Sequence, residues 1–371
     1  MKIDTFQLER NQSLYENSVE INLTESGVEP MTLAELLSPE ELDALLNLRL
    51  GYNYTEGTPE LRAAIASWYP DTGIDEVLVT TGAAEANFLM CWALLEPGDT
   101  FAGMLPNFMQ MQGLASALGA RVQPFGLRLD GNAWRLDRAA LDAAVAEGAR
   151  VIAVCNPNTP TGAVLDEADM DALVHAARAC DAWLLCDEIY RGAEIDGRPE
   201  TQSFRGRYAK TIVTSSTSKS IAHAGLRIGW AVAPAALVTE AVRRQDYTTI
   251  GTGPINQYLA SVVLSPARRA QLLTRSRAIL GRNMEIIDAW VARWNGRLRY
   301  VRPSAGGMVF VAYDFPVNST QLSERIRAEQ SVFVVAGDWF GMDGHLRIGT
   351  GGHAQELEEG LRRIDRVLAA L

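Results

Sequence analysis

The chain has 371 residues with a formal net charge of −11, and 47% of its residues are hydrophobic. This length exceeds what one small core can organise, so two domains are expected, and the acidity argues against nucleic acid or anionic membranes, which bind clustered basic side chains. The longest apolar stretch without proline, residues 88–95, is far shorter than the roughly 20 residues of a membrane helix, and no cationic leader opens the chain, so we expect a cytoplasmic protein without a membrane segment.

Two helix starts are visible near the N-terminus. Ser38-Pro39-Glu40-Glu41 has the pattern of a capping box with proline in the first turn and predicts a helix toward residue 48. Thr58 and Pro59 predict the next helix in the same way. The preceding segment, residues 1–36, is expected to pack on the smaller of the two domains and to bring residues 26–28 to the edge of a substrate site.

A strand, a glycine turn and a helix are predicted in succession from residue 77. Residues 77–80 are β-branched or aliphatic, and a helical pattern follows over residues 85–95. Backbone N–H groups at Gly82, Ala83 and Ala84 would be free at the start of this helix, where the helix dipole also favours an anion. The segment suits a phosphate, although a glycine before a helix is common and is weak evidence alone.

Two further strands lead into loops rich in proline. Residues 101–105 precede Pro106-Asn107-Phe108, and residues 151–155 precede Asn156-Pro157-Asn158-Thr159-Pro160-Thr161-Gly162. For the second loop, a proline-rich turn that closes a strand would explain the shape but not the composition. For the first loop, a core position is the alternative for the Phe108 side chain.

An apolar strand over residues 183–187 ends in Asp187. Ligands of an open parallel sheet bind beyond the carboxyl ends of its strands, where Asp187 would lie. A carboxylate there could pair with a cationic group of a bound ligand. A helix cap or a solvated loop is the alternative for an isolated Asp-Glu pair. Tyr190 follows three residues later.

Lysine is rare in this chain: of the 34 lysine and arginine residues, only three are lysines, namely Lys2, Lys210 and Lys219. Arginine cannot lose its proton in a protein, so a lysine retained against this bias suggests chemistry that needs a primary amine, such as imine formation with a carbonyl. Lys219 stands among small residues between Ser216 and Gly229, and Arg227 follows as a possible anion ligand. A loop of small residues with one solvated lysine is the alternative.

The order of elements predicts an α/β fold. Strands alternate with helices such as residues 141–147 and 167–179 as far as residue 234, which indicates βαβ units and a mainly parallel sheet. We assign residues 37–255 to a large cofactor-binding domain and residues 256–371 to a small α+β domain. The small domain is expected to contain helical material over 268–291, strands near 309–311 and 332–335, and a final helix from residue 355.

Close to the C-terminus, His345-Leu346-Arg347-Ile348-Gly349 carries a candidate carboxylate ligand. The planar guanidinium of Arg347 could bind a carboxylate through two hydrogen bonds, although a surface arginine on a strand is the alternative. The four cysteines and four histidines show no metal-ligand spacing, so we expect buried thiols in a reducing compartment and no metal site.

Together these segments resemble the class I/II aminotransferases, pyridoxal-phosphate enzymes of fold type I with the aspartate aminotransferase fold. The resemblance runs from Tyr52 to Arg347, in the order that the family requires. It implies pyridoxal phosphate as cofactor, an L-amino acid and a 2-oxo acid as small-molecule substrates, and a homodimer, because Tyr52 is similar to the tyrosine that reaches the phosphate of the neighbouring subunit.

The resemblance also implies a role for each matching residue. Lys219 would bind the cofactor covalently, Asp187 would pair with its ring nitrogen, Tyr190 would meet its phenolic oxygen, and Arg347 would hold the substrate α-carboxylate. The remaining expected cofactor and substrate contacts are Gly82, Ala83, Ala84, Phe108, Asn158, Ser216, Ser218, Arg227, Gly27 and Glu25. One position departs from the pattern: Thr159 replaces the asparagine that donates a hydrogen bond to the phenolic oxygen, and a hydroxyl is shorter and can rotate away.

Transamination is the leading functional hypothesis, and a lyase or cyclase acting by elimination on an arginine-like amino acid is the alternative. Residues 25–30 and 246–249 resemble the capreomycidine synthase branch of the family, and Glu25 or Glu29 could meet a guanidinium. A catalytically inactive binding domain is disfavoured, because both the lysine and the aspartate are present.

Overall fold

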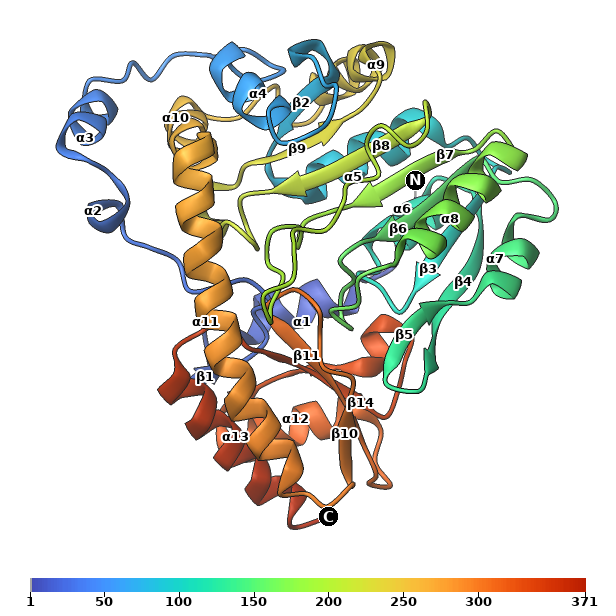
Figure 1. Cartoon of the computed structure of the whole chain (residues 1–371), viewed down its shortest axis with the longest axis vertical. Helices are drawn as coiled ribbons and strands as arrows, with labels where there is room; N and C mark the ends of the chain where they lie inside the picture. The colour runs from blue at the N-terminus through green and yellow to red at the C-terminus, as the bar shows by residue number, and fades with distance from the viewer. Residues whose placement is uncertain (1) are drawn as a thin grey trace.

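The computed structural model describes residues 2–371 and contains two packed regions, each built on its own sheet (Figure 1). The larger sheet has eight strands in the order β2-β9-β8-β7-β6-β3-β4-β5. Their bounds are Val77–Thr80 (β2), Thr100–Leu105 (β3), Arg121–Asp130 (β4), Ala133–Leu136 (β5), Val151–Cys155 (β6), Trp183–Asp187 (β7), Thr211–Ser216 (β8) and Gly229–Val232 (β9). Strands β4, β3, β6, β7 and β8 are mutually parallel, whereas β9, β2 and β5 pair antiparallel to their neighbours.

Helices cover both faces of this sheet, because alternate residues of its buried strands point to opposite sides. Ile152 and Val154 of β6 pack into one core with α4 (Pro59–Ala66), α7 (Arg138–Val145) and α8 (Glu167–Ala179). Val151 and Ala153 pack on the other side with α5 (Gly82–Leu94), α6 (Gln110–Ala117) and α9 (Ala235–Gln245). The α/β fold with a mainly parallel large sheet, expected from the sequence, is confirmed.

The smaller region has a four-stranded antiparallel sheet in the order β10-β11-β14-β13. Its strands are Leu298–Tyr300 (β10), Met308–Tyr313 (β11), Val335–Ala336 (β13) and His345–Gly349 (β14), and it packs with α12 (Ser319–Gln330) and α13 (Ala354–Leu368). The long helix α11 (Pro266–Ala292) runs alongside both regions and contributes side chains to both cores (Figure 1). It follows α10 (Pro254–Leu264), which packs on α4.

The N-terminal segment joins the smaller region. Strand β1 (Ile21–Asn22) pairs in parallel with β12 (Val332–Phe333), and Ile21, Leu23 and Val28 enter the smaller core. Helix α1 (Gln7–Tyr15) lies between the two regions, and α2 (Leu33–Leu36) and α3 (Pro39–Leu46) lie on a stretch that extends away from the body (Figure 1). Short 3-10 turns at Ile74–Glu76, Ala224–Leu226 and Gly337–Phe340 complete the elements.

Most predicted elements are present, with two differences. The strand predicted at residues 332–335 is two short strands in different sheets, because β12 pairs with β1 and β13 pairs with β14. The helix predicted from residue 85 begins at Gly82, so the N–H groups of residues 82–84 form its first turn. The domain boundaries at residues 36 and 255 stay a prediction. Within the described residues, no helix is both long and apolar enough to cross a membrane.

Candidate active site

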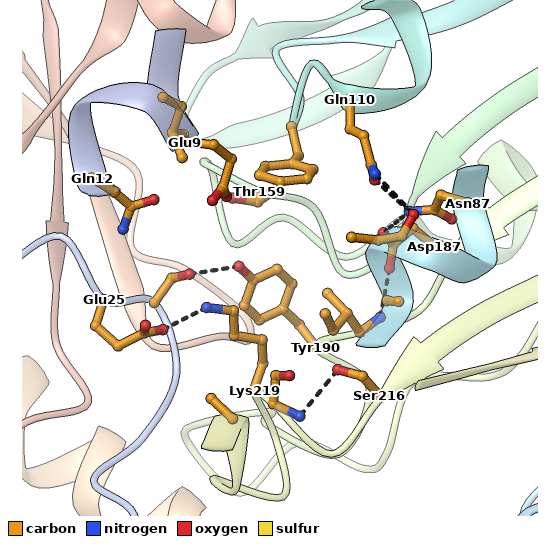
Figure 2. Close-up of a pocket in the computed structure, with 18 of the residues that line it drawn as sticks. Glu9, Gln12, Glu25, Asn87, Gln110, Thr159, Asp187, Tyr190, Ser216 and Lys219 are labelled. Carbon is orange, nitrogen blue, oxygen red and sulfur yellow. Dashed lines mark hydrogen bonds and ion pairs between the residues drawn. The ribbon is translucent and has the colours of Figure 1, made fainter. Parts of the chain in front are cut away.

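A cavity of about 370 Å³ lies between the two regions, at the carboxyl ends of the parallel strands (Figure 2). Twelve of the residues singled out in the sequence line it: Glu25, Ala83, Ala84, Phe108, Thr159, Asp187, Tyr190, Ser216, Ser218, Lys219, Arg227 and Arg347. The fold therefore brings together residues from five separate segments of the large sheet, from the N-terminal loop and from β14.

Lys219 lies in the loop after β8 and is paired with Glu25. The Lys219 Nζ atom donates to Glu25 Oε1 at 2.5 Å, and the same oxygen accepts the backbone N–H of Gly27 at 2.7 Å. Burial alone would lower the pKa of Lys219, but the negative charge of Glu25 and its hydrogen bond to the lysine outweigh burial and raise that pKa. Burial would likewise raise the pKa of Glu25, and Lys219 instead holds it at about 2. Without a cofactor, the lysine is therefore a stable ammonium.

Asp187 ends β7 and is 6% exposed. Its Oδ1 accepts the Ile189 N–H at 3.0 Å and its Oδ2 accepts the Asn87 Nδ2 at 3.3 Å, but within residues 2–371 it has no cationic partner. Burial raises its pKa to about 6, and these two hydrogen bonds oppose the rise. A buried carboxylate without a cationic partner would be stabilised by a cationic group of a bound ligand.

The N-terminal loop contacts three of the site residues in succession. The Thr24 carbonyl accepts a hydrogen bond from Arg347 Nη2 at 2.7 Å, Glu25 pairs with Lys219, and Ser26 Oγ lies 2.8 Å from the Tyr190 hydroxyl. Small residues allow the loop this close, since a Cβ on Gly349 would lie 2.1 Å from the Glu25 carbonyl oxygen. Gly27 itself lies against Lys219, since a Cβ added to this glycine would lie 3.5 Å from Cδ of the lysine. The loop thus fixes the geometry of the site from the small-region side.

A cradle for an anion forms where α5 begins. Gly82 has φ +76°, and a Cβ there would lie 2.7 Å from the Arg227 Nη2 atom, so a side chain would displace the guanidinium. Ser216 and Ser218 line the same part of the cavity, and Ser218 N donates to Ser216 Oγ at 3.0 Å. The free N–H groups of the first helical turn, two hydroxyls and one arginine fit a phosphate.

Asn158 and Thr159, in the loop after β6, have different roles. Asn158 is buried and does not line the cavity; its amide donates to the Pro106 carbonyl at 3.1 Å and its oxygen accepts from Thr161, so it holds the loop together. Thr159 lines the cavity, is 3% exposed, and its hydroxyl has no hydrogen-bond partner within the described chain. A buried hydroxyl without a partner is costly, and a ligand oxygen would satisfy it.

We expect a Thr159→Asn variant to change the titration of the cofactor rather than its binding. An amide reaches further than a hydroxyl and cannot turn its donors away, so it should withdraw more charge from the phenolic oxygen and lower the pH at which the lysine–cofactor linkage loses its proton. The measurement is the absorbance of the loaded protein between pH 5 and 10. A midpoint that is unchanged or shifted upward would contradict the role of Thr159.

Some contacts were not expected from the sequence. Asn87 holds Asp187 and is itself held by the Thr214 hydroxyl at 2.7 Å, and a polar residue inside the apolar helix 82–94 was the available signal. Helix α1 contributes Glu9, Gln12 and Ser13 to the cavity wall, and Glu16, the residue just after the helix, lines it as well. Tyr52, in contrast, is 97% exposed and lies outside this cavity, so within one chain it meets no part of the site.

The fold and this arrangement are those of a pyridoxal-phosphate enzyme, and sequence comparison gives the family. The sequence model for aminotransferase class I and II matches residues 29–364, so the chain belongs to this family and pyridoxal phosphate is its cofactor. The orphaned Thr159 hydroxyl, the unpaired Asp187 carboxylate and the cradle at Gly82 fit that cofactor.

Three relatives illustrate the range of the family. The chain is 31% identical to capreomycidine synthase of Streptomyces vinaceus, over 94% of this chain and 89% of the relative. It is 30% identical to an arginine–pyruvate transaminase of Pseudomonas aeruginosa, over 89% and 85% of the two chains. The crystal structure of a pyridoxal-phosphate-dependent aminotransferase from Streptococcus suis superposes with a TM-score of 0.92 at 28% identity and covers 100% of this chain and 99% of its own.

Proposed function

We propose that the protein is an aminotransferase that moves an amino group between an L-amino acid and a 2-oxo acid. The observation that carries the proposal is the convergence of Lys219, Asp187, Tyr190 and Arg347 on one cavity beside an anion cradle. The transaminases among its relatives support it. In this proposal Lys219 anchors the cofactor, Asp187 and Tyr190 contact its ring, and Arg227 with residues 82–84, Ser216 and Ser218 hold its phosphate.

The bound cofactor supplies an electron-accepting ring that stabilises negative charge at the substrate α-carbon. Arg347 orients the substrate by binding its α-carboxylate, which holds the α-hydrogen within reach of Lys219. Once the substrate amine has replaced Lys219 on the cofactor, the freed Lys219 amine would take the proton from the α-carbon as a base and give it up again as an acid. Asp187 keeps a carboxylate beside the ring nitrogen throughout.

A stoichiometric amino acid should bleach the yellow colour of the loaded protein, and a 2-oxo acid such as pyruvate or 2-oxoglutarate should restore it. This is expected because a transaminase leaves the amino group on its cofactor after the first half-reaction. The measurement is the visible absorbance during sequential additions. Repeated turnover without any 2-oxo acid, and without loss of colour, would favour the alternative below.

That alternative is a lyase or cyclase acting by elimination on an arginine-like amino acid. Two observations favour it: the 31% identity to capreomycidine synthase over 94% of this chain, and the Glu25 carboxylate placed beside Lys219. An eliminating enzyme regenerates its starting form in every turnover. Product analysis with arginine and no acceptor therefore separates the two reactions.

We also propose that two copies of the chain pair through the face around residues 33–54. Large apolar side chains are exposed there: Leu33, Leu42, Leu46, Leu50, Tyr52 and Tyr54. Contact with a second copy would remove this surface from water. Because the Tyr52 side chain is almost fully exposed, it would be available to complete the phosphate site of the neighbour.

Mixing an inactive Tyr52→Phe variant with an inactive Lys219→Ala variant should restore activity, up to about a quarter of the wild-type level under random exchange, since half the dimers are then hybrids with one intact site. The restored activity is measured against each variant alone. A monomeric wild-type protein by light scattering at working concentration would overturn the pairing.

A further inference from the structure

One side of the cavity is acidic and is formed mainly by helix α1. Glu9, Gln12 and Ser13 share one face of the helix, Glu16 at its C-cap continues that face, and all four residues line the cavity. Figure 2 shows Glu9, Gln12 and Glu25 along one side of the cavity and Asp187 with Asn87 on the other. This acidic side thus faces the part of the cavity expected to hold the cofactor ring.

Apolar contacts hold α1 in this orientation. Leu8 is buried against Phe310, Val335 and Phe340 of the smaller region, and the Phe6 ring meets the Phe108 ring edge-on with 4.8 Å between centroids. The helix is therefore anchored by Leu8 and the neighbouring Phe6, and its glutamate side chains are not required for this packing.

Glu9 and Glu16 have no protein partner. Within residues 2–371 neither carboxylate forms an ion pair or a side-chain hydrogen bond. Partial burial raises the pKa of the Glu9 carboxyl, although Lys219 and Arg347 act in the opposite direction. A cationic group placed between the helix and the cofactor would pair with this carboxylate.

Arg347 independently indicates that the cavity is built for a ligand. It is 3% exposed, its Nε atom has no hydrogen-bond partner, and within residues 2–371 no carboxylate lies at ion-pair distance from it. A buried guanidinium with one backbone acceptor needs an anion, and a substrate carboxylate supplies it. The ligand is thereby fixed at one end, and its side chain is left to meet the acidic side.

The proposed function leaves a surplus of negative charge. Arg227 is assigned to the phosphate, Arg347 to the α-carboxylate, and Asp187 to the ring nitrogen. Lys219 is assigned to the cofactor, so Glu25 would no longer hold the free ammonium with which it now pairs at 2.5 Å. Glu9, Glu16 and Glu25 then remain around the cavity without a cationic partner from it.

We infer that the substrates are amino acids with a cationic side chain, a guanidinium or a primary ammonium, which is bound by Glu9 and Glu16 with Glu25 beside them while Arg347 holds the α-carboxylate. The inference rests on the proposed function for the position of the carboxylate. It names the substrate class of the same site, and it applies equally to transamination and to elimination.

The test uses the loaded protein and ligands that lack an α-amino group, so that binding is measured without reaction. Titration calorimetry compares 5-guanidinopentanoate and 6-aminohexanoate with hexanoate, which has the same carboxylate and a neutral tail. We expect at least one cationic ligand to bind about tenfold more tightly than hexanoate, since two carboxylates would contact its tail. The stronger of the two cationic ligands identifies the preferred side-chain group.

Replacing both acids, Glu9→Gln and Glu16→Gln, should bring the affinities of the cationic ligand and of hexanoate close together without weakening hexanoate. Glu29→Gln is the matched control, because Glu29 lies in the same N-terminal segment and lines a different pocket, near His353. It should leave the preference intact. Unchanged hexanoate binding shows that the double variant is folded.

Equal affinities in the wild type, or a preference that survives in the double variant, would overturn the inference. The outcome is separable from that of the proposed function. Colour cycling with a neutral amino acid and a 2-oxo acid, without any preference for a cationic ligand, would refute the substrate class and leave the transaminase in place. A preference for a cationic ligand without colour cycling would support the substrate class and refute the transaminase.

Discussion

A Lys219→Ala variant is expected to lose the absorbance of the lysine-bound cofactor and to lower turnover by about 10⁴-fold or more, because the residue is both the proposed anchor and the proposed acid and base. The cavity offers no substitute amine. Lys219 is the only lysine that lines it, and the other two lysines of the chain are Lys2 and Lys210. The measurements are the visible spectrum of the purified variant and its rate with the best wild-type substrate.

Lys2→Ala and Lys210→Ala are the controls and should keep both colour and turnover. Lys210 forms a surface ion pair with Asp181 at 2.6 Å, so its loss should have little effect on stability. Borohydride reduction of the wild type should attach the cofactor to a single peptide. Attachment to a peptide that does not contain Lys219 would refute the anchor.

The sequence predicts the strand ends of the large sheet well. Buried parallel strands are continuous apolar runs, and a polar residue stops each run, so the strand over residues 183–187 and the position of Asp187 at its end both follow from the sequence. The same logic gives the strand at residues 151–155. In the small region the strands are only two to six residues long, and there the prediction merges two strands of different sheets.

Contacts between distant segments could not be predicted in the same way. The pair of Glu25 and Lys219 joins residues that are 194 positions apart, and no local pattern specifies such a contact. This contact also reverses the effect of burial, because Glu25 raises the pKa of Lys219 whereas burial alone would lower it. Helix α1 and its polar face toward the cavity were likewise not predicted from the sequence.

An Asp187→Asn variant should bind the cofactor and yet turn over about 10²- to 10³-fold more slowly, because the ring nitrogen loses its charged partner while the proposed phosphate contacts remain. Asparagine keeps an oxygen that can accept the Ile189 N–H, so the backbone there should not change. Cofactor content and turnover per bound cofactor are the two measurements. Loss of binding with normal turnover per bound cofactor would contradict the role of Asp187.

A second measurement on the cofactor-free protein tests the charge itself. Burial raises the pKa of Asp187 from 3.8 in the unfolded chain to about 6, so the folded state holds the proton more tightly and ionisation of this group lowers stability as the pH rises through that range. The neutral Asp187→Asn variant lacks this loss, and its melting temperature relative to the wild type should increase between pH 4 and pH 7. Asp181→Asn is the control, because that aspartate lies at the surface and pairs with Lys210. A melting difference that does not depend on pH would mean that Asp187 is not a buried charge awaiting the ring nitrogen.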